Sequence, residues 1–283
     1  MISGKYANHS NANNSVLSTT VPEGDTIHKI ARYLDEQLRE RVVLRVRLRP
    51  MFGASSGPGR VVCVRSEGKH LFVTFDDGRQ LRSHLGMYGS WHRYGRGEGW
   101  RKPARQASIV LSTKDMDYVC FNAKEVQWLR VQGFERADQG NRLGPDLIDD
   151  GAETNDILRR IDALLSPDTT IVDLLLDQRI AAGIGNVYKS EVLFLERQSP
   201  SQRLRDLRVE TISGLYRRAA LLLRENLGGG PRATRRNLDG HGHLWVYGRF
   251  DLPCLRCGDK IRRVRSGVNP RSTYWCGNCQ RDA

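Results

Sequence analysis

Four cysteines near the C-terminus constrain this chain most, because together they require a shared partner. They form two Cys-x2-Cys pairs separated by eighteen residues, in "CLRCGDKIRRVRSGVNPRSTYWCGNC". Two such pairs bring four thiolates to one point, which is the donor set of a closed, tetrahedral, structural Zn²⁺ site. A piece of about thirty residues buries too little surface to fold otherwise, so the metal supplies its stability. The predicted ligands are Cys254, Cys257, Cys276 and Cys279.

The segment between the pairs predicts a β-hairpin from "KIRRVRSG" and "RSTYW", so residues 250–283 are expected to form a zinc ribbon. Two disulfides, or a redox Cys-x2-Cys, are the alternatives. The absence of a signal peptide in the leader indicates a reducing compartment and disfavours both. His241 and His243 are alternative ligands. Five cations against one acid in the hairpin suit a DNA groove and its phosphates.

Charge points to the same class of partner. The 283 residues include 45 Lys and Arg against 32 Asp and Glu, a net charge of +13. Such an excess attracts polyanions, nucleic acid first, and a merely solvated basic surface is the alternative. No run approaches the about 18 apolar residues of a membrane helix, so no membrane partner is expected.

The chain divides by pattern into four regions after a polar leader without periodicity, residues 1–21, which we interpret as disordered or as a wrongly assigned start. Helical spacing from Ile27 to Leu38 is followed by alternating runs typical of an antiparallel sandwich. Helical patterns dominate the second half. The predicted fold is α+β and multidomain: a β-sandwich domain flanked by helices (22–135), a linker (136–153), a helical domain (154–249) and the ribbon (250–283).

A glycine-rich turn lies between two helical runs in "AAGIGNVYKSEVLF". Gly183 and Gly185 allow tight backbone geometry, and Asn186 is a candidate N-cap. Free N–H groups at the helix start, with Lys189 nearby, predict an anion site. An ordinary helix connection is the alternative.

Three motifs now stand together: "PEGDTIHKIA", "GIGNVYKSE" and the paired Cys-x2-Cys, with "RSHLGMYG", "RLGPDLI" and "PRSTYWCGNCQ" between and after them. In this combination the chain resembles, over residues 22–280, the bifunctional DNA glycosylase/AP lyases of the formamidopyrimidine-DNA glycosylase and endonuclease VIII family. The resemblance implies a helix–two-turn–helix in the second domain. It also implies a monomeric base-excision repair enzyme that binds damaged DNA, duplex, bubble or single-stranded, inside a bacterial cell.

The resemblance also implies a mechanism. Pro22 would be the nucleophile: its secondary amine attacks C1′, expels the base and forms an iminium, which requires the unprotonated amine. Glu23 would relay protons during sugar opening, and Lys69 would contact phosphate and assist as an acid. Elimination would then cut the strand on both sides. A good first turn of a helix and an ordinary turn lysine are the alternatives for these residues.

DNA contacts follow from the resemblance too. Asn186 matches a phosphate-contacting asparagine, with Lys189 nearby, and Arg271 matches the zinc-finger arginine beside the lesion. Met87 matches an apolar wedge that fills the gap left by a flipped base, and a buried strand methionine is its alternative.

Two departures bear on the substrate. Thr26 replaces an acid of the family's opening motif, and "VCFNAKEV" lacks the arginine that the formamidopyrimidine branch places opposite the lesion. This favours the endonuclease VIII branch, with oxidised pyrimidines or abasic sites as substrates.

Two rival functions remain open. If residues 1–21 stay attached, Pro22 nitrogen is an amide, and the chain would be a catalytically silent protein that binds damaged DNA. We expect instead that translation starts at Val21, read as initiator methionine and then removed. A zinc-ribbon transcription or RNA-binding protein is the second rival, and the glycine-rich turn between helices does not suit it.

Overall fold

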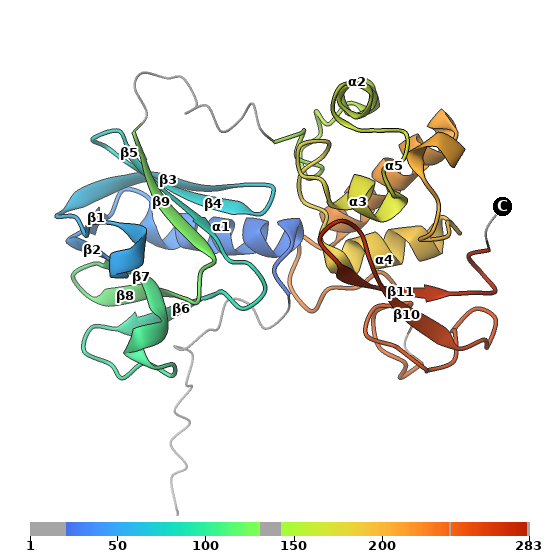
Figure 1. The fold of residues 1–283 in the computed structure, drawn as a ribbon. Coiled ribbons are helices and arrows are strands. Elements are labelled where there is room, and N and C mark those ends of the chain that lie inside the picture. The colour runs from blue at the N-terminus through green and yellow to red at the C-terminus, as the bar shows by residue number, and fades with distance from the viewer. Residues whose placement is uncertain (1–20, 131–142, 238, 282–283) are drawn as a thin grey trace, which may run out of the picture.

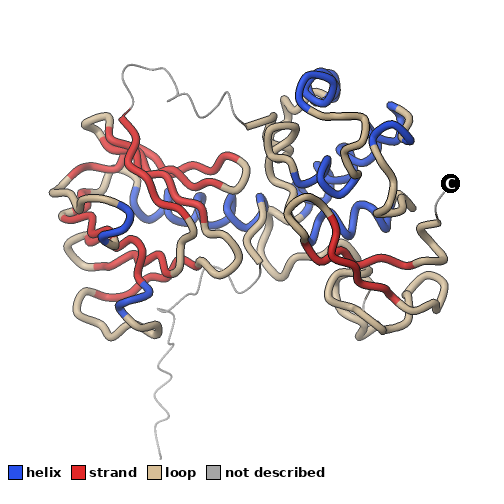
Figure 2. The backbone as a smooth tube through the Cα atoms, viewed as in Figure 1, coloured by secondary structure: helices blue, strands red, loops and turns tan. Residues whose placement is uncertain are grey.

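The computed structural model describes residues 21–130, 143–237 and 239–281. Strands fill one lobe of the molecule, and helices with a C-terminal hairpin fill the other (Figure 1, Figure 2). Residues 1–20 of the leader lie outside the described residues. Among those described, no helix is long and apolar enough to cross a membrane.

The first lobe is a sandwich of two antiparallel sheets, as the alternating sequence predicts. One sheet has the order β1-β3-β4-β5-β9 and the other the order β2-β7-β8-β6. Their facing side chains, with helix α1 (Gly24–Leu38), form one apolar core. The strands are β1 (Val42–Val43), β2 (Arg45–Leu48), β3 (Gly59–Glu67), β4 (His70–Phe75), β5 (Arg79–His84), β6 (Ser90–Gly95), β7 (Ala107–Ser112), β8 (Met116–Phe121) and β9 (Glu125–Arg130).

Helix α1 joins the two lobes. Its buried residues recur at helical spacing, as predicted, and pack on the sandwich core. Its N-terminus instead touches the second lobe, where Gly24 N donates to Gly183 O at 3.0 Å. A side chain at Gly24 would collide with that turn, because its Cβ would lie 2.9 Å from Gly183 Cα.

The second lobe holds α2 (Thr154–Leu164), α3 (Ile171–Leu176), α4 (Asn186–Leu195) and α5 (Val209–Glu225) around its own core. Thr170 caps α3: its hydroxyl accepts from Asp173 N at 3.1 Å. The predicted cap Asn186 is wrong, because α4 begins after Gly185, which makes Asn186 its first helical residue.

Part of the predicted linker, residues 136–142, lies outside the described residues. The remainder packs into the helical lobe: Leu147 is buried in its core, and Gly144 N donates to Gln178 O at 2.8 Å.

The predicted hairpin is present as β10 (Ile261–Ser266) paired antiparallel with β11 (Arg271–Cys276). It lies beside α4 in Figure 1. Its tip is fixed to α3, since Val268 N donates to both carboxylate oxygens of Asp173, at 3.0 and 3.2 Å.

Candidate active site

A cleft of about 1180 Å³ opens between the two lobes, and we call it the interlobe cleft. Its walls come from the segment just before α1, from the β3–β4, β5–β6 and β8–β9 connections, and from α3, the start of α4 and the hairpin. Six of the seven predicted catalytic and DNA-binding residues line it: Pro22, Glu23, Lys69, Met87, Asn186 and Arg271.

Glu23 is 1% exposed and anchors the cleft floor. Its carboxylate accepts from the backbone N–H groups of Gly185, Val187 and Tyr188 at 3.0, 2.7 and 3.2 Å. These are the free N–H groups at the start of α4, whose positive dipole end favours an anion. The sequence analysis predicted an anion site at these N–H groups, and in the structure the protein's own glutamate occupies them.

The glycines of "GIGN" allow this arrangement. A Cβ on Gly185 would lie 2.4 Å from Glu23 Cδ, so a side chain there would expel the carboxylate. Gly183 has φ +113°, a conformation that favours glycine. The turn is therefore shaped around Glu23.

Arg232 is a site residue that the sequence analysis missed. Its side chain is 4% exposed and forms two hydrogen bonds with Asp25, at 2.6 and 3.1 Å. It also donates to Val21 O at 3.2 Å and lies 4.0 Å from Glu23 Oε1. Glu23 and Asp25 are two buried acids at the start of α1, and such acids need a cation. This requirement is the signal that could have indicated a buried arginine or lysine.

Lys69 sits at the β3–β4 turn and points at the same floor, where its Nζ donates to Ile184 O at 2.7 Å. Burial lowers the pKa of Lys69 to about 8; the Glu23 carboxylate works against this shift, and the Arg271 cation adds to it. The turn is held by Gly68, whose φ is +55° and whose N–H donates to Asp146 at 2.7 Å.

Lys189 is placed differently from the expectation. It is 0% exposed, and its Nζ donates to Asn186 Oδ1 (2.7 Å), Thr273 Oγ1 (2.8 Å) and Ser272 O (3.3 Å). This placement does not support a direct contact with DNA. The lysine fixes Asn186, which itself donates to Ser272 O at 2.8 Å, and so joins α4 to the hairpin.

Met87 and Arg271 face each other across the cleft mouth. Met87 lies in the β5–β6 loop and is 51% exposed, which excludes a buried strand methionine. Arg271 Nη1 approaches its Sδ to 3.5 Å. The mouth therefore carries an apolar side chain and a cation side by side.

Glu191, also missed, is a buried carboxylate within α4. It accepts from the backbone N–H groups of Trp245, Val246 and Tyr247 at 2.8 to 2.9 Å. Desolvation raises its pKa, while hydrogen bonds from Thr234 and that backbone oppose the rise. It fixes the segment that leads into the hairpin and places Tyr247 in the cleft wall.

The four predicted ligands converge: the thiol sulfurs of Cys254, Cys257, Cys276 and Cys279 lie within 4.8 Å of one another. Neither disulfides nor histidine ligands are needed, since all four cysteines are free thiols gathered at one point. Four soft sulfur donors and no open position fit a structural zinc ion. This site secures the hairpin that carries Arg271.

Family models match most of the chain. The formamidopyrimidine-DNA glycosylase N-terminal domain matches residues 21–126, and the H2TH domain of the same enzymes matches residues 143–236. The zinc finger found in FPG and IleRS matches residues 251–281. The chain thus belongs to the formamidopyrimidine-DNA glycosylase family.

Particular relatives carry endonuclease VIII names. "Probable endonuclease 8 2" of Streptomyces coelicolor is 37% identical, over 92% of this chain and 94% of its own. "DNA-(apurinic or apyrimidinic site) lyase Nei2" of Mycolicibacterium smegmatis is 34% identical, over 92% and 99%. A solved Lactococcus lactis formamidopyrimidine-DNA glycosylase bound to AP-site DNA shares the fold, with TM-score 0.76, 19% identity, and 92% and 100% coverage.

Proposed function

We propose that this chain is a DNA glycosylase and AP lyase that uses the nitrogen of Pro22 as its nucleophile. One observation carries this proposal: Pro22 lines the interlobe cleft beside Glu23 and Lys69, and both of those side chains are fixed to the same turn before α4. A nucleophile, a carboxylate and a cation thus meet on one polar floor.

The reaction follows from these groups. The proline lone pair attacks C1′, the base leaves with the bonding electrons and takes up a proton, and the amine loses its own proton. The C1′–O4′ bond then opens to an iminium, and Glu23 takes up the proton that the amine loses and passes it to O4′. The iminium acidifies C2′–H, whose loss expels the 3′ phosphate. A second elimination expels the 5′ phosphate.

The reactive form must begin at Pro22, because an acylated nitrogen has no lone pair to donate. In the described structure Arg232 holds the Val21 carbonyl, so Val21 lies inside the cleft wall. Removal of Val21 would leave the Arg232 guanidinium at most about 6 Å from the proline nitrogen, given ordinary C=O and C–N bond lengths. A cation so close disfavours protonation of the amine and keeps it nucleophilic.

The proposed substrates are oxidised pyrimidines and abasic sites in bacterial DNA. In support, β8 and β9 are joined by three residues only, Asn122 to Lys124, so this connection has no room for an inserted arginine loop. A single chain supplies both walls of the cleft, which suits a monomer.

Borohydride trapping tests the proposal. Protein that begins at Pro22 is expected to form a covalent adduct with an abasic-site duplex, and Pro22→Gly to lose it. Protein that keeps residues 1–21 should bind the duplex without trapping, which is the silent-binder alternative. Failure of the Pro22-initiated protein to trap contradicts the proposed mechanism.

A further inference from the structure

A second concave surface lies on the sandwich lobe, outside the interlobe cleft. It has a volume of about 580 Å³, and we call it the outer hollow. Its lining joins one aromatic ring to three cations and one acid: Arg47, Glu98, Trp100, Arg101, Lys102, Pro103 and Ala104. None of these residues takes part in the proposed chemistry.

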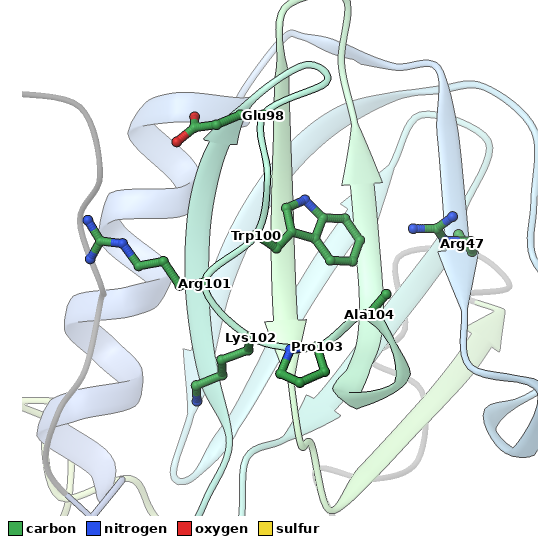
Figure 3. Close-up of a pocket in the computed structure, with 7 residues that line it drawn as sticks. All are labelled: Arg47, Glu98, Trp100, Arg101, Lys102, Pro103 and Ala104. Carbon is green, nitrogen blue, oxygen red and sulfur yellow. The ribbon is translucent and has the colours of Figure 1, made fainter.

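The indole of Trp100 is a fixed platform. It packs on the outer face of the β2-β7-β8-β6 sheet, where its ring centroid lies 5.8 Å from that of Phe121 and 6.2 Å from that of Tyr94. Figure 3 shows the indole lying broad side outward over the strands. One face is therefore occupied by the protein, and the ring is partly exposed.

Cations flank this platform on two sides. Arg101 and Lys102 lie to one side of the indole and Arg47 to the other (Figure 3). The Arg47 guanidinium reaches over the Trp100 ring, 5.6 Å from its centroid. Lys102 is held by Ser90, with Nζ donating to Oγ at 2.8 Å. Exposed Arg47 and Arg101 can each meet a phosphate, because two phosphates flank every nucleotide of a strand.

The outer hollow continues toward the interlobe cleft. The hollow ends at Pro103 and Ala104, and two residues later Gln106 accepts at its carbonyl from Asn122 N, at 2.9 Å. Asn122 lines the interlobe cleft. One backbone hydrogen bond therefore joins the segment at the end of the outer hollow to a residue of the cleft wall.

We propose that the outer hollow binds a nucleotide of single-stranded DNA, with the base stacked on Trp100 and its phosphates paired with Arg47 and Arg101. An aromatic platform beside a basic track is how proteins hold single strands without reading sequence. The inference rests on the proposed function only in taking DNA as the ligand. It predicts a preference for lesions next to unpaired strands.

The test compares a blunt duplex that carries one abasic site with tailed versions of the same duplex. Each tailed version has a ten-nucleotide thymidine tail on one end of one strand, and all four positions are tested. Wild type should bind at least one tailed duplex about fivefold or more tightly than the blunt one, measured by fluorescence anisotropy at fixed salt. We call the ratio of these two affinities the tail advantage. The variants Trp100→Ala, Arg47→Ala and Arg101→Ala should each reduce it. Trp100→Phe should largely keep it.

Controls separate this inference from the proposed function. Arg217→Ala removes an exposed charge from α5, outside both concave surfaces, and should leave the tail advantage intact. All variants should keep blunt-duplex affinity and borohydride trapping. The inference fails if wild type shows no tail advantage, or if the arginine and tryptophan variants keep it in full. Loss of trapping by the Pro22-initiated wild type would instead count against the proposed function.

Discussion

The interlobe cleft and the outer hollow are both basic and concave, but they are built on different scales. Contacts in the cleft join distant parts of the chain, such as Glu23 with Gly185 and Arg232 with Asp25. Six of the seven residues of the outer hollow come from the stretch 98–104. The cleft therefore depends on the docking of both lobes, whereas the hollow depends on one sheet and one loop. Damage to either should spare the other.

Loss of zinc should give the largest effect, and it should impair the interlobe cleft without impairing the outer hollow. Cys276→Ser removes a ligand from a site type with apparent binding free energies of about 10–16 kcal/mol, so the hairpin should unfold and release Arg271. Trapping should fall by more than about 100-fold, because protein with an unfolded hairpin loses Arg271 and one wall of the cleft, while the tail advantage survives. Zinc content and trapping are measured together, with Cys63→Ser, a free thiol outside the cluster, as control. Full trapping by zinc-free protein would show that the interlobe cleft does not depend on the zinc site.

Glu23→Gln comes next in expected size. The amide would point a donor at backbone N–H groups of α4, leaving one or more unsatisfied at about 1–3 kcal/mol each. Loss of the proton relay should slow strand cleavage by about 100-fold. Glu191→Gln is the matched control, because it perturbs an equally buried glutamate that does not line the cleft.

Thermal unfolding and product gels distinguish the two glutamate variants. Both should lower Tm, but only Glu23→Gln should lose cleavage out of proportion to folded protein. Equal cleavage rates in the two variants would remove Glu23 from the chemistry.

Lys69 should set the alkaline limb of the pH profile. Its pKa is lowered to about 8, so the ammonium form is present below that pH and is lost as pH rises through it. If Lys69 acts as an acid, kcat/KM should fall on that limb. Lys69→Arg keeps its charge, so the limb should move to higher pH, with some loss of rate from altered geometry. An unmoved limb would show that another group titrates there.

Replacement of Arg232 should give the smallest effect, a shift of the acid limb of the same pH profile. This limb reports the Pro22 amine, whose ordinary pKa is about 7.7–8.0. Glu23 and Lys69 line the cleft beside Pro22, and Arg232 pairs with Asp25 and lies 4.0 Å from Glu23. Arg232→Gln removes the nearest cation of its network, so the limb should rise by roughly 0.5 to 1 pH unit. Arg232→Lys should restore it, and no shift in either variant would contradict this electrostatic role.

Sequence patterns predicted the structure correctly where the signal lies within a single helix, strand or short motif. The Cys-x2-Cys spacing predicted the zinc ligands, and alternation predicted the sandwich. Periodicity predicted α1 and the four helices of the second lobe. Each of these signals is local, so it survives without knowledge of the fold.

Sequence patterns failed where partners come from far along the chain. Asn186 resembles an N-cap, yet Glu23, more than 160 residues away in sequence, caps α4. Lys189 resembles a phosphate ligand, yet the hairpin covers it. Arg232 lies in a glycine-rich break with no periodicity, so only the folded first turn of α1 reveals its role. These long-range polar contacts define the floor of the cleft.

Peptide mapping of the borohydride adduct tests the central claim most directly. After trapping on an abasic duplex, proteolysis and mass spectrometry should place the reduced sugar on the nitrogen of Pro22, in a peptide that starts with that residue. A sugar on Lys69, on another lysine, or on a chain that still begins before Pro22 would contradict the account.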